Sequence, residues 1–219
     1  MTARAAPVEK MPAREAYALL APEYDRSPNA LISLEERTMA PLLPDLRGRR
    51  AVDVGAGRGR WASRLAARGA FAIAVDFCHE MLQWTSTPAV QADGGLLPLR
   101  DSCADFVVCA FALGYAPDIF GELRRIVRPG GMVLASDVHP EALRRGWTRT
   151  FRHNGGAIEV AHDAYSLEDL RAPDLRLTGL SEPRLGEPER AIFEQAGYAE
   201  RFAETSQFPA IFVAQWVRR

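Results

Sequence analysis

The sequence predicts an α/β fold with a mostly parallel, doubly wound sheet that helices cover on both faces. Two observations predict it. Short apolar segments alternate with helix-patterned segments from about residue 48 to residue 137, and a glycine-rich turn joins the first such pair. Strands and helices that alternate at this spacing form right-handed βαβ units, which build parallel sheets. The 219 residues suit one domain with a substantial core, so we expect a single domain over residues 1–219.

The elements of the first part follow from periodicity and from turn residues. The first twelve residues are expected to be irregular, and helices are expected over residues 13–20 and 31–39. In the alternating part, strands are expected over residues 50–54, 71–75, 89–91, 105–110 and 132–136. The helices between them are expected over residues 59–68, 78–84 and 118–127.

Past residue 137 the alternation changes. Ser166–Leu170 begins like a capped helix, and residues 192–196 have a helical pattern. Strands are expected over residues 175–180 and 208–217, the second being the final strand of the chain.

Composition narrows the possible functions. The net charge of -1 gives no strong field toward nucleic acid or an anionic membrane. Three cysteines without CxxC spacing indicate a reducing compartment and no metal cluster, so we expect a cytoplasmic protein with no bound metal. No apolar run of membrane-spanning length occurs, and the first residues lack the pattern of a signal peptide.

A glycine-rich turn, residues 52–60, lies between the first predicted strand and its helix. Gly55, Gly57 and Gly59 let the backbone turn sharply and approach a ligand closely. Arg60 stands where a dinucleotide-binding fingerprint has its third glycine, and Asp53 precedes the first glycine. A carboxylate there suits a ligand with an ammonium group and disfavours a pyrophosphate. The alternative is a tight turn without a ligand.

A second acidic residue, Asp76, ends the second predicted strand. In open α/β sheets a carboxylate at this place lies across the crevice and accepts hydrogen bonds from the two hydroxyls of a ribose. Asp76 could instead cap the helix that follows it. Both interpretations stay open on the sequence.

These segments resemble the class I S-adenosylmethionine-dependent methyltransferases, specifically the small-molecule enzymes of the methyltransferase domain 11/25 type. Residues 53–59 resemble the family's first motif, and Asp76 resembles its ribose-binding acid. The segments 91–93, 105–112 and 123–131 resemble three further motifs, in the expected order. The resemblance covers about residues 50–137. It implies a Rossmann-like sheet of seven strands, the last antiparallel, under a helical N-terminal cap.

The resemblance also implies a cofactor, S-adenosyl-L-methionine, with S-adenosyl-L-homocysteine as product. It assigns residues 1–40 to the cap, 48–137 to the cofactor-binding half, 138–208 to substrate-side insertions and 209–217 to the last strand. Tyr17, Tyr24 and Asp25 look like the cap segment that closes over the methionine end in many relatives. Tyr24 and Met81 could equally be packing residues. The implied cofactor-binding residues are Tyr24, Asp53, Gly55, Ala56, Gly57, Gly59, Asp76, Phe77, Met81, Ala92, Asp93, Gly94, Ala110 and Phe111.

A general base is needed only where the acceptor has a pKa well above neutral. His139 is the candidate catalytic residue, because it follows the fifth predicted strand and strand C-termini face the ligand crevice. Asp137 is close enough in sequence to orient it. A loop histidine of this kind can also be merely structural.

The expected acceptor is a small, partly hydrophobic molecule. Phe111, Leu113, Gly114 and Tyr115 follow the fourth strand and should wall its pocket, and Trp84, Trp147 and Phe151 could add aromatic surface. The Asn/Asp-Pro-Pro-aromatic segment of many nucleic-acid amide methyltransferases is absent, so no nucleic-acid or membrane partner is expected. We expect a monomer or a homodimer.

Three alternatives remain. The chain could bind the cofactor without transferring its methyl, as carboxymethyl transferases and rearrangement catalysts do, or bind it without catalysis. An NAD-linked oxidoreductase is disfavoured by Arg60.

Overall fold

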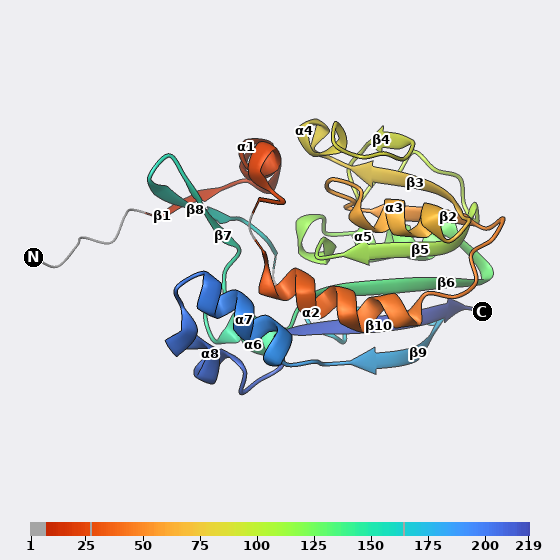
Figure 1. The fold of residues 1–219 in the computed structure, drawn as a ribbon. Coiled ribbons are helices and arrows are strands. Elements are labelled where there is room, and N and C mark those ends of the chain that lie inside the picture. The colour runs from red at the N-terminus through yellow and green to blue at the C-terminus, as the bar shows by residue number, and fades with distance from the viewer. Residues whose placement is uncertain (1–7, 27, 164) are drawn as a thin grey trace, which may run out of the picture.

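A seven-stranded sheet forms the centre of the computed structural model, which describes residues 8–26, 28–163 and 165–219 (Figure 1). In spatial order its strands are β4 (Ala89–Gln91), β3 (Phe71–Asp76), β2 (Arg50–Val54), β5 (Ala104–Ala110), β6 (Val127–Val138), β10 (Ile211–Arg218) and β9 (Leu175–Ser181). β10 runs antiparallel to both β6 and β9, whereas the pairs from β4 to β6 are parallel. This confirms the predicted Rossmann-like fold and its antiparallel last strand.

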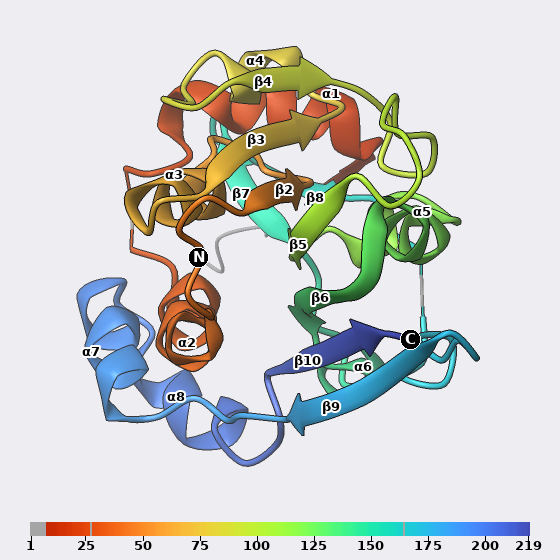
Figure 2. The ribbon, with the colours of Figure 1, turned by 90° about the vertical axis from the view of Figure 1, so that its right-hand side faces the viewer.

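Helices cover both faces of the sheet because its strands are apolar on both faces. Along β5, Val107 and Cys109 pack with α5 (Ile119–Ile126), whereas Phe106 and Val108 pack with α2 (Ala30–Met39) and α3 (Arg60–Ala67). Successive strand side chains point to opposite faces, which is why neighbours in sequence join different clusters. Figure 2 shows α2 and α3 on one side of the sheet and α5 on the other. The sheet is doubly wound, as predicted.

A second, three-stranded sheet was not predicted. It consists of β1 (Val8–Met11), β8 (Gly156–Val160) and β7 (Thr150–His153), with β1 parallel to β8. Together with α1 (Ala13–Leu20) it lies beyond the carboxyl ends of β3 and β5 (Figure 1). The expectation that the first twelve residues are irregular is therefore wrong for residues 8–11, because a partner strand far along the chain pairs with them.

Within the alternating part, α4 (His79–Leu82) lies inside the helix predicted over residues 78–84. Past residue 137, α7 (Glu187–Gln195) overlaps the helix predicted over residues 192–196, whereas α6 (Pro140–Arg144) and α8 (Ala199–Thr205) were not predicted. The predicted helix at Ser166–Leu170 is wrong: Ser166 and Asp169 exchange the expected capping bonds, but the chain makes only a turn. Within the described ranges, no helix has the length and apolar character that a membrane span requires.

Glu35 joins α2 to the sheet. Its side chain is fully buried and accepts hydrogen bonds from Trp61 Nε1 (2.8 Å), Arg60 Nη1 (2.7 Å) and Ser136 Oγ (3.1 Å). A buried carboxylate is stable only when its oxygens are paired in this way. These bonds fix the N-terminal segment beside the glycine-rich turn.

Candidate functional site

The glycine-rich turn lies where the backbones of three strand ends converge. The amides of Gly55 and Ala56 donate to the carbonyl oxygen of Val75, at 2.8 and 3.0 Å, which draws the turn against β3. Gly55 has φ +69°, and a Cβ on it would lie 2.2 Å from the Cβ of Ala112, beyond the end of β5. Glycine is therefore required at this position by conformation and by close approach.

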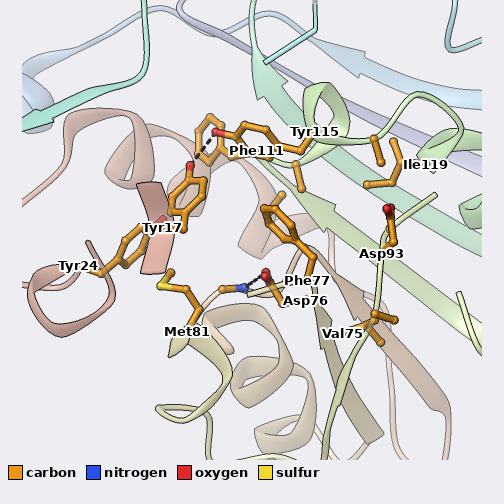
Figure 3. A pocket seen from close by; sticks show the side chains of 17 residues that line it. Tyr17, Tyr24, Val75, Asp76, Phe77, Met81, Asp93, Phe111, Tyr115 and Ile119 are labelled. Carbon is orange, nitrogen blue, oxygen red and sulfur yellow. Dashed lines mark hydrogen bonds between the residues drawn. The ribbon is translucent and has the colours of Figure 1, made fainter. Parts of the chain in front are cut away.

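Asp76 ties the turn to the end of β3. Its Oδ2 accepts from the Gly57 amide at 2.7 Å, drawn as a dashed line in Figure 3, and its Oδ1 accepts from the Cys78 amide at 2.8 Å. Burial raises the pKa of this carboxyl group, and the backbone donors lower it. Asp76 thus holds local structure and also lines the pocket described below.

Asp53 is almost completely buried behind the turn. Its Oδ2 accepts from the amide of Ala62 in the first turn of α3 at 2.8 Å, so it stabilises that helix start. Burial is the main cause that raises its pKa to about 7, which the bond from Ala62 partly offsets. The carboxyl group is therefore poised to lose its proton when a positive charge approaches.

The predicted cofactor-binding residues converge on two adjoining cavities. The first, of about 700 Å³ including the space open to solvent, is the pocket drawn in Figure 3, and we call it the cofactor pocket after the residues predicted to bind there. The predicted residues that line it are Tyr24, Gly55, Gly57, Asp76, Phe77, Met81, Ala92, Asp93, Gly94, Ala110 and Phe111. The other three, Asp53, Ala56 and Gly59, line a hollow beside the glycine-rich turn that shares Tyr24, Gly55, Gly57, Ala110 and Phe111 with the pocket.

Sequence reasoning did not name several lining residues of the cofactor pocket as cofactor-binding. These are Tyr17, Val75, Ala112, Tyr115, Ala116 and Ile119. Three of them carried a signal: Tyr17 through the resemblance of its segment to a cap, Ala112 through the motif of residues 105–112, and Tyr115 as an expected acceptor wall. Their hydroxyl oxygens lie 2.7 Å apart, which joins α1 to the segment after β5.

A second chamber of about 820 Å³, again including open space, adjoins the cofactor pocket. The two share Tyr17, Tyr24 and Phe111, which form the partition between them. Trp147 and Phe151, which the sequence offered as aromatic surface for an acceptor pocket, line this chamber. Its other lining residues are Leu20, Asn29, Leu31, Ile32, Val138, Leu143, Thr148, Arg149, Thr150 and Val160.

The remaining predicted wall residues lie elsewhere. Trp84 is half exposed and lies outside the chamber. The guanidinium carbon of Arg58 stacks on it, 4.1 Å from the centre of the Trp84 ring. Leu113 and Gly114 are buried in a short 3₁₀ turn, and Tyr115 faces the cofactor pocket.

Arg149 lies at the base of the partition, and nothing in the sequence singled it out. Its Nη1 donates to the carbonyl oxygen of Phe111 (2.5 Å) and to the hydroxyl of Tyr115 (2.7 Å), and its Nη2 donates to Asp137. Phe111 has φ +57°, uncommon for a residue other than glycine, and Arg149 holds the carbonyl of that residue.

His139 lines neither the cofactor pocket nor the second chamber. Its Nδ1 accepts from the Glu141 amide at 3.0 Å and caps α6, so Nε2 carries the proton and donates to Glu182 at 2.7 Å. The ring lies in a separate hollow with Pro140 and Tyr165. The geometry therefore gives no support to His139 as the catalytic base.

Comparison with known families identifies a methyltransferase domain over residues 52–135. These residues run from β2, the strand before the glycine-rich turn, through most of β6. They include every motif that carried the sequence resemblance.

Curated relatives match over longer segments. The chain is 28% identical over 152 residues to the biotin biosynthesis bifunctional protein BioHC of Cellvibrio japonicus, covering 64% of this chain and 30% of that protein. It is 31% identical over 137 residues to a malonyl-[acyl-carrier protein] O-methyltransferase of Pectobacterium atrosepticum, covering 58% of this chain and 54% of that protein. The matches thus span about half of these relatives or less.

Solved structures share the fold. An S-adenosylmethionine-dependent methyltransferase from Mesorhizobium loti superposes with a TM-score of 0.66 at 19% identity, over 87% of this chain and all of that one. The order of motifs, the sheet with its antiparallel last strand and the matched domain lead to one conclusion. Residues 52–135 form a methyltransferase domain, and the chain has the fold of S-adenosylmethionine-dependent methyltransferases.

Proposed function

We propose that this chain transfers the methyl group of S-adenosylmethionine to a small, partly hydrophobic acceptor. One observation carries the proposal: the cofactor pocket and the largely apolar chamber meet at Tyr17, Tyr24 and Phe111. A methyl donor in the first cavity and an acceptor in the second would face each other across this partition. The names of the curated relatives favour oxygen as the accepting atom.

The residues of the cofactor pocket suit the parts of S-adenosylmethionine. The backbone of the glycine-rich turn and Asp53 would hold the amino-acid end, whose ammonium group matches a buried carboxylate. Asp76 would accept from the ribose hydroxyls with the lone pairs that its two backbone donors leave free. Asp93 would face the adenine amino group. Phe77 and Met81 would pack against the adenosine, beside the backbone of Ala92 and Gly94.

The sulfonium group supplies an electrophilic methyl, so the protein need not activate that half of the reaction. The residues of this chain then have two tasks, to align the acceptor atom with the methyl and to exclude water. Alignment and exclusion of water account for several kcal/mol of catalysis in comparable systems. Tyr17, Tyr24 and Phe111 are placed to do both.

The test begins with cofactor binding. Isothermal titration should show S-adenosylhomocysteine binding, and Asp76→Ala should weaken it by about 1–3 kcal/mol, because the ribose hydroxyls and the amides of Gly57 and Cys78 lose an acceptor. Asp45→Ala is the matched control, since Asp45 is exposed and bonds only to its neighbour Arg47 among the described residues. No binding at millimolar concentration would overturn the proposal.

Transfer is tested with cofactor labelled in its methyl group, incubated with the small-molecule fraction of a cell extract. Label in a product supports methyl transfer. Binding without label transfer would point to the alternatives, a carboxymethyl transferase, a rearrangement catalyst or a non-catalytic binding protein.

A further inference from the structure

The second chamber, which the proposed function assigns to the acceptor, has one charged residue in its described lining. Its described lining residues are apolar or neutral, with the single exception of Arg149. No aspartate, glutamate, histidine or lysine is among them. A lone cation in an otherwise apolar chamber favours a ligand with an apolar body and one anionic group.

The guanidinium group of Arg149 has hydrogen-bond donors to spare. Of its five N–H groups, two on Nη1 are used by Phe111 and Tyr115, and one on Nη2 is used by Asp137. This leaves Nε–H and the second hydrogen of Nη2. Nε is buried and has no partner in the described part of the chain, and the same holds for Oδ2 of its ion-pair partner Asp137. A second contact within this pair would satisfy both atoms, and the remaining hydrogen of Nη2 is then the donor left for a ligand.

Asp137 holds this group in place from behind. Asp137 is fully buried, lies outside the chamber lining and pairs with Arg149, whose side chain is only 13% exposed. The nearby carboxylate and phenols raise the pKa of Arg149 well above its ordinary value despite burial, so the guanidinium group stays charged. A fixed, planar fork of this kind matches the two oxygens of a carboxylate.

The chamber also lacks, among its described lining residues, a group that could remove a proton from the acceptor. His139 is turned away, and burial raises the pKa of Tyr24 above the usual value of a phenol, so Tyr24 stays protonated at neutral pH. The acceptor must therefore arrive as a nucleophile. A carboxylic acid with a pKa near 4 does so, because it is ionised at neutral pH, whereas an alcohol does not.

We propose that the acceptor is a carboxylic acid with an apolar body, and that Arg149 binds its carboxylate in the chamber. This inference rests on the proposed methyl transfer. In the reaction the bond between the sulfur and the methyl carbon breaks, and a bond from a carboxylate oxygen to that carbon forms. The products are a neutral methyl ester and S-adenosylhomocysteine. The negative charge of the acceptor and the positive charge of the sulfonium cancel, so no proton is released and no base is needed.

Three probes of the same size test the charge preference directly. Isothermal titration of the full chain saturated with S-adenosylhomocysteine would compare 3-phenylpropanoate, 3-phenylpropanol and 3-phenylpropylamine. We expect the carboxylate to bind at least tenfold more tightly than the alcohol and the amine. Equal affinities, a preference for the alcohol or the amine, or no binding of the carboxylate would overturn the inference.

Variants locate the preference at Arg149. Arg149→Met should abolish the advantage of the carboxylate, and Arg152→Met is the matched control, because Arg152 is exposed and lines neither cavity. Arg149→Met alone leaves Asp137 buried without a partner, so the double variant Asp137→Asn/Arg149→Met is tested beside it. A folded variant without Arg149 that keeps the carboxylate preference contradicts the role of Arg149. If neither variant folds, the probe comparison on the unaltered chain decides.

The chemistry of the product separates this inference from the proposed function. A methyl ester releases labelled methanol in mild alkali, whereas methyl ethers and methylamines do not. Release of the label as methanol supports the carboxylate. Alkali-stable labelled product would overturn the carboxylate and leave methyl transfer standing. Failure to bind S-adenosylhomocysteine would instead remove the proposed function itself.

Discussion

Asp53 and Asp76 each have a structural role that the sequence could not separate from a ligand-binding one. Both are buried, and both accept hydrogen bonds from backbone amides around the glycine-rich turn. The sequence predicted their places because a motif marks them. Arg149 carries no motif, and its bonds to Phe111 and Tyr115 form only when the segment just before β7 folds against the end of β5, so no pattern in the chain could have identified it.

Asp53 should make the stability of the protein depend on pH. Its pKa is about 7 in the folded chain against an ordinary value of 3.8, so between these pH values the folded state keeps a proton that the unfolded state has lost. The stabilisation that the protonated Asp53 gives the folded state is therefore fully present below about pH 4, and it is lost as the pH rises through 7. We expect Asp53→Asn to remove this decline, which is on the order of 4 kcal/mol, measured by urea unfolding at pH 4–8. An unchanged slope in the variant would contradict the assignment.

His139 should contribute to stability and not to turnover. His139→Ala removes the acceptor that caps α6, which typically costs about 1 kcal/mol of unfolding free energy. The rate of methyl transfer should stay within about twofold of the unaltered enzyme. His139→Asn serves as the control, since asparagine is a good cap and should restore stability. A large loss of rate without loss of stability would return His139 to the catalytic site.

At the scale of elements, the strands and helices of residues 48–137, where the two alternate, could be predicted from the sequence. Each strand from β2 to β6 pairs within a repeated βαβ pattern, so its apolar run and the turn after it define it locally. The small sheet was missed because β1 is a mostly exposed four-residue segment whose partner, β8, lies far along the chain. Ser166–Leu170 was predicted wrongly because a capping pair begins a helix only where an apolar face follows for several turns.

The glycine-rich turn should be intolerant of side chains for a reason that can be measured. Gly55→Ala forces φ +69° on an alanine and places its Cβ 2.2 Å from Ala112. We expect a loss of about 2 kcal/mol or more in unfolding free energy, and a parallel loss of S-adenosylhomocysteine affinity. Gly146→Ala is the control, because Gly146 has φ +83° but a Cβ added to it would meet nothing within 4 Å. It should show the conformational cost alone, and equal losses in the two variants would contradict the steric explanation.

For the whole molecule, Glu35 is the main polar connection between the N-terminal segment and the sheet. Glu35→Ala strands the Trp61 and Ser136 donors in the interior, and we expect it to cost about 3 kcal/mol of unfolding free energy. Its neighbour Glu36, which pairs with Arg60 and Arg64 nearer the surface, is the matched control. Glu36→Ala should cost less than about 1 kcal/mol in the same urea titration. Similar costs would show that burial is not the deciding factor.

The pairing of β1 with β8 has a consequence for how the enzyme is assembled. Val8 pairs with Ala157, and Met11 with Val160, so closing this small sheet joins the beginning of the chain to a segment near its last third. Contacts between such distant segments form slowly, since a long loop must close first. All residues that line the cofactor pocket lie between Tyr17 and Ile119, whereas β7 and β8 contribute Thr150, Phe151 and Val160 to the second chamber. Under the proposed function, a chain that is still being synthesised would therefore contain the residues for its methyl donor before those that select the acceptor.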